Sequence, residues 1–281
     1  MAREAVTIFA PDRLVQDVKE CYFYHSMDIP GYGAVTGEWD LRHRMSDYLG
    51  NISFDGKRVL EMGTADGFAC FYMESQGAEV VAFDLSGAET WDVVPFARDN
   101  SKIFNVERKH HIERLNNAFW LSHRAFRSKS RMVYGNAYSI PAEIGDVDIA
   151  TFGSILLHLR DPFLALHQAL RLTRETVVVT DLAEPLGVPA VVRRWRQNLP
   201  KNLGRPAMKF LPDWKVSRPQ ETWWQLSPEL IKSFIGVLGF EQTRVTYHSH
   251  DYYGGKRKAK IKLFTVVGHR TQPRSPRSPS A

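Results

Sequence analysis

The fold is indicated most directly by Val59-Leu60-Glu61-Met62-Gly63-Thr64-Ala65-Asp66-Gly67-Phe68, an apolar run that passes into a turn. Gly63 and Gly67 permit a sharp turn between a strand and a helix, and they let a ligand approach the backbone because no Cβ intervenes. Asp84 ends the next apolar run, where its carboxylate is placed to accept hydrogen bonds from ribose hydroxyls. No third glycine completes the dinucleotide-binding pattern G-x-G-x-x-G. These residues predict a strand-turn-helix unit that binds a nucleoside ligand other than a dinucleotide.

Around this unit, short apolar runs alternate with helical stretches, which is typical of βαβ folds. The run at 79–84 is apolar almost throughout, which indicates a strand buried on both faces. The predicted strands are 58–62, 79–84, 131–134, 147–153, 177–181, 243–248 and 261–267, and the predicted helices are 68–76, 103–126, 162–172 and 228–238. Together they predict an α/β fold with a doubly wound, mostly parallel sheet of seven strands and helical cap insertions.

The elements also suggest how the chain is divided. Residues 56–270 form the predicted main domain, and they contain two insertions, at about 86–130 and 185–225. The first insertion is longer than the dozen or so residues that a plain crossover needs. Residues 1–55 lie outside the alternation and are expected to form an N-terminal helical or lid segment. The basic tail at 271–281, which contains Arg-Ser-Pro twice, cannot bury a core and is expected to be disordered.

Composition narrows the class of protein. The chain has 281 residues, of which 43% are hydrophobic and 24% charged, which suits one large folded domain and excludes a disordered or fibrous chain. Cys21 and Cys70 show no disulfide-framework or zinc-ligand spacing, so no metal site is expected. No apolar run reaches the roughly 18 to 20 residues of a membrane helix, and the N-terminus lacks a signal-peptide core. We therefore predict a soluble protein of the cytoplasm with no membrane partner.

The formal charge of +6 is distributed unevenly along the chain. The segments 101–131, 192–218 and 256–281 together contain 24 basic and three acidic residues. Basic clusters attract phosphates and carboxylates over long distances, although such runs are also common as solvated faces. Two of the three clusters fall in the insertions expected to frame the ligand site. This placement favours an anionic small molecule as partner and leaves nucleic acid as the second class of partner; the oligomeric state stays open.

Several motifs resemble those of class I S-adenosylmethionine-dependent methyltransferases. The resemblance rests on the pattern acid-x-G-x-x-x-G at Glu61 to Gly67, on Asp84 and on the strand containing Asp148-Ile149-Ala150, and it covers about residues 57–182. Three segments are similar to a bacterial subgroup that contains tRNA wobble-uridine carboxymethyltransferases and small-molecule-modifying relatives: Tyr24-His25-Ser26-Met27-Asp28, Gly63-Thr64-Ala65-Asp66-Gly67-Phe68 and Gly153-Ser154-Ile155-Leu156-Leu157-His158-Leu159-Arg160-Asp161-Pro162. No residue is assigned to hold the extra carboxylate of the carboxymethyl cofactor, so ordinary S-adenosylmethionine is the expected cofactor.

The resemblance implies a cofactor site residue by residue. Glu61 and the turn from Gly63 through Thr64 and Ala65 to Gly67 would surround the methionine part of the cofactor. Asp84 would hold the ribose diol and Leu85 would pack on the adenine. The remaining implied contacts are Asn136 and Ala137 near the adenine amino group, and Gly153 and Ser154 on the sulfonium side.

Three residues are candidates for the proton acceptor in methyl transfer. His158 lies just past the fourth strand, where substrate and cofactor meet in this fold, and histidine titrates in the useful range. The alternative for His158 is a structural histidine bonded to a loop carbonyl. Asp181, at the end of the fifth strand, and His25, in the N-terminal segment, are the other two candidates; Asp181 could equally cap the loop that follows.

Candidate substrate-binding residues are aromatic or basic. Trp223 and Trp224 could form an apolar wall, although large aromatic residues also dominate ordinary cores. Arg193 and Arg194 offer forked guanidinium groups for phosphate or carboxylate. Tyr24 stands beside His25 in the predicted lid.

The leading interpretation is a methyltransferase that acts on a small, partly apolar and anionic molecule, most simply by in-line transfer to oxygen. A tRNA-modifying methyltransferase is the first alternative, supported by the basic segments but lacking an attached RNA-binding module. A non-catalytic cofactor-binding protein is the second, and the intact set of Gly63, Gly67 and Asp84 argues against it.

Overall fold

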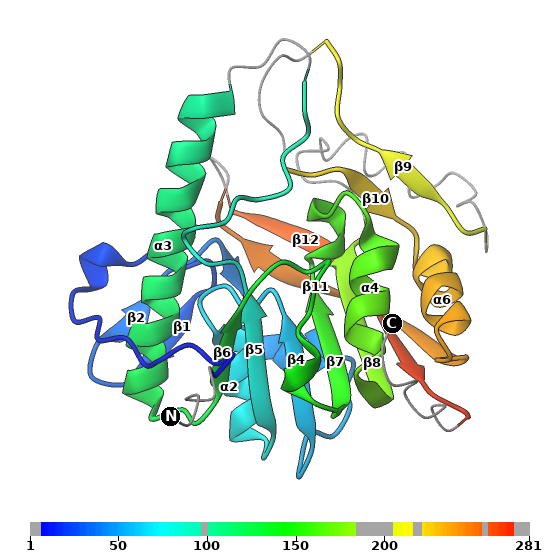
Figure 1. The fold of residues 1–281 in the computed structure, drawn as a ribbon, viewed down its shortest axis with the longest axis horizontal. Coiled ribbons are helices and arrows are strands. Elements are labelled where there is room, and N and C mark those ends of the chain that lie inside the picture. The colour runs from blue at the N-terminus through cyan, green and yellow to red at the C-terminus, as the bar shows by residue number, and fades with distance from the viewer. Residues whose placement is uncertain (1–6, 97–100, 184–204, 216–220, 255–257, 273–281) are drawn as a thin grey trace, which may run out of the picture.

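The computed structural model describes residues 7–96, 101–183, 205–215, 221–254 and 258–272. In this part of the chain, eight strands form one mixed sheet in the order β3-β11-β12-β8-β7-β4-β5-β6 (Figure 1). Their bounds are β3 Trp39–Asp40, β4 Arg58–Met62, β5 Glu79–Asp84, β6 Arg131–Tyr134, β7 Val147–Gly153, β8 Thr173–Leu182, β11 Gln242–Tyr252 and β12 Ala259–His269. The sheet confirms the predicted doubly wound α/β fold.

The five strands β4 to β8 run parallel, so their carboxyl ends meet at one edge of the sheet. β12 runs antiparallel to β8 and pairs with β11 as a long hairpin. All seven predicted strands are present, and four of the first five begin and end within a residue of the prediction. The eighth strand, β3, was not predicted: β11 extends to Tyr252, beyond the predicted end at 248, and Trp39 pairs with that extension.

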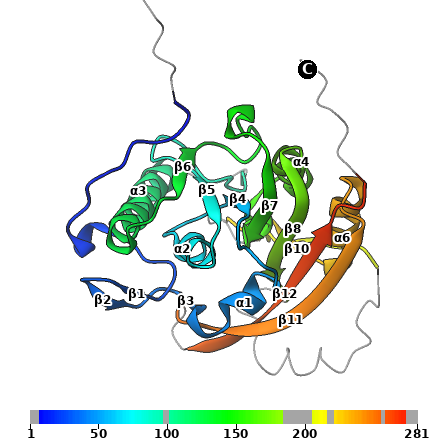
Figure 2. The same cartoon turned by 90° about the horizontal axis from the view of Figure 1, so that it is seen from below.

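Helices cover both faces of the sheet (Figure 2). α1 Met45–Tyr48, α2 Phe68–Ser75 and α3 Ser101–Phe126 lie on one face, and α4 Pro162–Leu170 and α6 Pro228–Val237 lie on the other. Successive strand residues point to opposite faces, so Val59 packs in the core with α2 and α3 whereas Leu60 packs in the core with α4 and α6. Both residues are fully buried, which explains the uninterrupted apolar runs.

The N-terminal segment packs along the sheet instead of forming a separate unit. The Ala10 amide donates to the Met132 carbonyl at 2.8 Å on the outer strand β6. A short hairpin follows, made of β1 Met27–Ile29 and β2 Gly33–Val35. The chain then enters β3 at the opposite edge of the sheet. Residues 7–49 therefore cross the α3 side of the molecule, and Tyr24 and His25 reach the carboxyl ends of the parallel strands on the way.

The two predicted insertions are partly described. In the first, the predicted helix 103–126 is confirmed as α3, which starts two residues earlier. In the second, residues 205–215 and 221–226 contain a two-stranded hairpin, β9 Met208–Phe210 with β10 Trp224–Leu226. Arg193, Arg194 and the tail from residue 273 lie outside the described residues. No helix in the described ranges has the length and apolar character needed to cross a membrane.

Candidate active site

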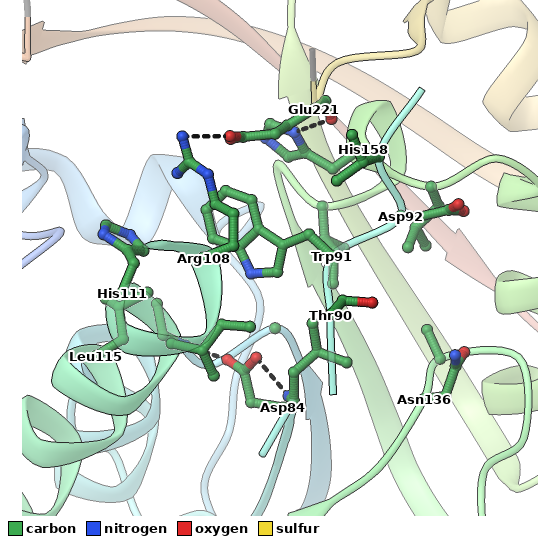
Figure 3. A pocket seen from close by; sticks show the side chains of 18 of the residues that line it. Asp84, Thr90, Trp91, Asp92, Arg108, His111, Leu115, Asn136, His158 and Glu221 are labelled. Atoms are coloured by element: carbon green, nitrogen blue, oxygen red, sulfur yellow. Dashed lines mark hydrogen bonds and ion pairs between the residues drawn. The ribbon is translucent and has the colours of Figure 1, made fainter. Parts of the chain in front are cut away.

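A cavity of about 800 Å³ opens at the carboxyl ends of the parallel strands. Each of four strands contributes wall residues from its last positions or the turn that follows: Met62 and Gly63, Asp84 and Leu85, Gly135 to Tyr138, and Gly153 to Ile155. The opposite wall comes from the first insertion, including Trp91, Arg108 and Leu115 (Figure 3). The cavity therefore lies between the parallel sheet and the insertion, where open α/β sheets bind their ligands.

Asp84 sits at the floor of this cavity. Its Oδ2 accepts from the Ala65 amide at 2.7 Å, and its Oδ1 accepts from the Leu85 amide at 2.7 Å (Figure 3). A carboxylate oxygen can accept more than one hydrogen bond, so both oxygens keep acceptor capacity for a ligand. Burial raises the pKa of Asp84 to about 6, although the two amide bonds act in the opposite direction. The geometry suits the recognition of a diol.

The turn after β4 is held in an unusual backbone conformation. Gly63 has φ of +76°, and a Cβ there would come within 2.6 Å of the Ile155 side chain. Ala65 in the same turn and Ser154, which follows β7, also have positive φ, at 51° and 52°, although neither is glycine. Such a conformation costs of order 1 to 3 kcal/mol per residue. Both strained residues lie in the cavity wall, which is where strain of this kind is usually functional.

A second, smaller cavity of about 40 Å³ continues the first toward the sheet. The two share Tyr24, Gly63, Ala65 and Gly153 as wall residues. Glu61 lines the small cavity and accepts from the Thr64 hydroxyl at 2.6 Å; its burial raises its pKa to about 7.

The N-terminal segment closes this cavity through His25. The Asp66 carboxylate, which is fully buried, binds both the backbone amide and the Nδ1 of His25 at 2.6 Å. The ring of His25 also stacks on Phe68. Asp66 thus fixes the predicted lid to the turn after β4, and it places His25 beside Glu61 instead of in the wall of the large cavity.

His158 lines the large cavity and has a defined tautomer. Its Nδ1 lies 2.8 Å from the carbonyl oxygen of Glu221, and a carbonyl can only accept, so Nδ1 carries the proton. In a neutral ring Nε2 then keeps its lone pair. Burial lowers the pKa of His158, which favours the neutral ring. The ring therefore has an unprotonated nitrogen available as a base.

Asp181 lies near the end of β8, one residue before its last residue, and pairs with Phe264 of β12. Its Oδ1 accepts from the Leu182 amide at 2.7 Å, and burial raises its pKa to about 7. It lines neither cavity among the described residues. β8 contains the predicted strand 177–181 and begins four residues earlier, at Thr173, which pairs with Val147 of β7.

Trp223 and Trp224 line neither cavity in the described part of the chain. The indole nitrogen of Trp223 donates to the Asp92 carbonyl, and that of Trp224 donates to the Leu159 carbonyl at 3.1 Å. They attach the segment before α6 to the wall, whereas Tyr24 lines the large cavity, and its predicted contact with substrate stays a prediction. Gly67 is buried and lines neither cavity in the described part of the chain.

Sequence reasoning missed several wall residues, namely Trp91, Asp92, Arg108, His111 and Glu221. Trp91 and Asp92 belong to the first insertion, and Arg108 to its basic cluster, so the length of the insertion and its charge were the available signals. Nothing in the sequence pattern singles out Glu221. Its place in the wall depends on how the second insertion folds back.

The fold and the site define a nucleoside-binding α/β enzyme. Residues 38–229 match the profile of a family described as a methyltransferase domain, and the chain belongs to this family. It is an S-adenosylmethionine-dependent methyltransferase, as the sequence predicted. No protein with a curated description matches the sequence.

Several solved structures are similar to this chain in fold. The N-terminal domain of EvdMO1, crystallised with SAH and D-fucose, is 14% identical with a TM-score of 0.48, over 90% of this chain and 92% of that one. Magnesium protoporphyrin IX methyltransferase from Synechocystis PCC 6803 with SAH is 10% identical with a TM-score of 0.48, over 82% of each chain. The 1,6-didemethyltoxoflavin-N1-methyltransferase of Burkholderia thailandensis is 13% identical with a TM-score of 0.47, over 83% of this chain and 78% of that one.

The residues present fit the cofactor. Asp84 offers spare acceptor capacity for the ribose hydroxyls, and Asn136 and Ala137 line the same cavity nearby, where the adenine contacts were predicted. Thr151 Oγ1 in the small cavity is buried and has no hydrogen-bond partner among the described residues. A buried polar atom of this kind is normally satisfied, so it is suited to bond a ligand.

Proposed function

We propose that this methyltransferase transfers its methyl group to an oxygen of a small molecule, with His158 as the general base. The observation that carries the proposal is that His158 lines the cavity with its Nδ1 bonded to the Glu221 carbonyl, which leaves Nε2 unprotonated in the neutral ring. The same bond is the loop-carbonyl contact expected of a structural histidine, and the replacement of His158 described below distinguishes the two roles. Proximity and proton removal are the two contributions that methyl transfer to a hydroxyl requires from the protein.

Each reacting group has a place in this scheme. When bound, S-adenosylmethionine supplies an electrophilic methyl group and a neutral thioether as leaving group. His158 Nε2 takes the proton of the acceptor hydroxyl as the oxygen forms its bond to the methyl carbon. The resulting imidazolium keeps its Nδ1 bond to the Glu221 carbonyl, which stabilises the positive charge.

The dimensions and lining of the cavity support a small acceptor. A space of about 800 Å³ is within the range of pockets for drug-sized ligands and must hold cofactor and acceptor together. Ile112, Leu115 and Trp91 make one side apolar. An apolar side of this kind suits a partly apolar acceptor molecule.

The anionic character of the acceptor stays a prediction. Two arginines of the cavity wall lie beside acids: Arg108 is 2.5 Å from Glu221 and Arg160 is 3.2 Å from Asp92. Each arginine charge is therefore balanced by a carboxylate of the same cavity wall. Arg193 and Arg194 are the basic residues predicted to bind an anionic group, and they lie outside the described residues.

The proposal is tested by replacing His158 with alanine. A positioned base typically contributes about 10² to 10⁴-fold, so turnover should fall by that order while the affinity for S-adenosylhomocysteine stays within about twofold. Turnover is measured as release of S-adenosylhomocysteine with a panel of phenols, sugar alcohols and hydroxy acids, and affinity by calorimetry. Equal losses of turnover and cofactor affinity would show that His158 is structural.

The acid side of the pH–rate profile provides a second measurement. Burial lowers the pKa of His158, so the ring stays neutral and basic to lower pH than an ordinary imidazole. With S-adenosylmethionine saturating at every pH, kcat should therefore hold through neutral pH and decline only below about 6.5, the ordinary value for histidine. A decline that begins above that value would contradict the assignment.

A further inference from the structure

One ion pair joins the two insertions across the large cavity. Arg108 projects from α3 and its guanidinium lies 2.5 Å from the carboxylate of Glu221, in the segment that leads into β10 (Figure 3). The two side chains are 28% and 20% exposed, so water screens the pair only in part. The Arg108 guanidinium also lies 5.0 Å from the centre of the Trp91 ring, within cation–π distance.

The same residue, Glu221, has a second contact through its backbone. Its carbonyl oxygen is the acceptor for His158 Nδ1 at 2.8 Å. The side chain and the main chain of Glu221 therefore connect α3 with His158. Two residues further on, the Trp223 amide donates to the Leu157 carbonyl at 2.9 Å, which attaches this segment to the residue before His158.

His158 depends on this carbonyl for its chemical state. A neutral imidazole can carry its proton on either nitrogen, and the partner of one nitrogen decides which tautomer is present. If the carbonyl of Glu221 moved away, a buried N–H would lose its acceptor, which is unfavourable because the group would be desolvated without a partner. The ring would then shift its proton or rotate, and Nε2 would no longer be reserved as the base.

We propose that Arg108 and Glu221 are positioning residues that fix the tautomer of His158 by holding the Glu221 carbonyl in place. This inference rests on the proposed base role of His158 for its catalytic meaning, but the tautomer itself is independent of that role. Because the pair joins the two insertions, His158 keeps the tautomer of an active base only while both insertions are in place at the cavity. A simple wall contact between Arg108 and Glu221 would seal the cavity without affecting the ring.

The test uses variants that remove the side-chain contact and keep the carbonyl. Glu221→Ala retains the backbone acceptor, and Arg108→Met retains most of the aliphatic length without the charge. Arg108→Lys restores a cation and should rescue part of the effect. Lys109→Gln is the matched control, because Lys109 is the next residue of α3 and is exposed.

The first readout is nitrogen NMR of histidine-labelled protein without cofactor or acceptor, with the His158 signals assigned by their loss in His158→Ala. The wild type and Lys109→Gln should show one tautomer, with the proton on Nδ1. Glu221→Ala and Arg108→Met should show a mixture of tautomers, and combining them should add little, because both break the same contact. A single Nδ1–H tautomer in all variants would overturn the proposal.

The second readout separates this proposal from the function proposed above. Glu221→Ala and Arg108→Met should lower kcat by about 10- to 100-fold, as small misplacements of catalytic groups do, with S-adenosylhomocysteine affinity unchanged. In a His158→Ala background the same changes should lower kcat no further. If the tautomer shifts but His158→Ala keeps full turnover, positioning is supported and the base role is overturned. A kcat loss that persists at full size in His158→Ala would overturn positioning through His158.

Discussion

The carboxylate of Asp84 accepts hydrogen bonds from two backbone amides of the cavity wall and still lines the cavity. Two backbone amides hold its oxygens at 2.7 Å, which fixes their direction before a ligand arrives. Such preorganisation reduces the ordering cost of binding. Glu61 is held in a comparable way by the Thr64 hydroxyl in the small cavity.

Removing the Asp84 carboxylate should weaken cofactor binding. Hydrogen bonds to a charged acceptor contribute about 1.5 to 3 kcal/mol, so Asp84→Ala should raise the Kd for S-adenosylhomocysteine by roughly 10- to 100-fold. Calorimetry measures the change, and Asp12→Asn is the control because Asp12 is exposed and lines neither cavity. Unchanged affinity in Asp84→Ala would contradict the ribose contact.

The same site should respond to pH. Burial raises the pKa of Asp84 to about 6 and that of Glu61 to about 7, so both carboxylates take up protons as the pH falls through this window. Protonation removes the charge that attracts the cofactor ammonium and weakens the acceptor for its hydroxyls. Affinity for S-adenosylhomocysteine should therefore fall between about pH 8 and about pH 5.

At the scale of elements, α2 and α3 explain why the second glycine of the motif is needed. Gly67 precedes α2 with φ of +85°, and a Cβ at this position would come within 2.5 Å of the Phe71 ring and 2.8 Å of the Phe119 ring. Phe71 belongs to α2 and Phe119 to α3, and both are buried. The glycine therefore serves the packing of two helices against each other as well as the turn.

This packing predicts a difference between two glycine substitutions. Gly56→Ala, where φ is +67° and no atom lies within 4 Å of the added Cβ, should cost only about 1 to 2 kcal/mol for the backbone. Gly67→Ala should cost about 2 to 5 kcal/mol, because overpacking adds about 1 to 3 kcal/mol. Urea unfolding of both variants measures this, and equal losses would contradict the packing role of Gly67.

At the scale of the whole molecule, α3 carries exposed basic charge in the first insertion. The exposed residues Lys109, Arg124 and Arg127 follow the length of α3 and its end. An exposed basic helix of this kind attracts any polyanion, so charge alone does not distinguish a small anionic acceptor from RNA. RNA can be distinguished from a small anionic acceptor by measuring how the binding affinity changes with salt concentration.

We expect RNA binding to be weak and nonspecific. Filter binding of a transfer RNA should show affinity at low salt that falls steeply as salt rises, with no preference over an unrelated RNA of equal length. Affinity that survives at about 0.2 M salt and favours the transfer RNA would support the tRNA-modifying alternative.

The sequence alone determined the parallel core and the nucleoside site, because both depend on local patterns. The mostly apolar runs 58–62 and 147–153 match β4 and β7 residue for residue, since each strand is buried on both faces for most of its length. Gly63 and Asp84 were predicted for the same reason: their roles follow from positions at strand ends.

Tertiary structure alone decided which residues that are distant in the sequence contact one another at the site. His25 contacts Asp66 across 41 positions and His158 contacts Glu221 across 63. No periodicity records such separations, because they depend on the paths of the N-terminal segment and the insertions. A histidine in the sequence predicts only the ability to titrate, whereas the direction of its proton depends on the single carbonyl that the fold brings to Nδ1.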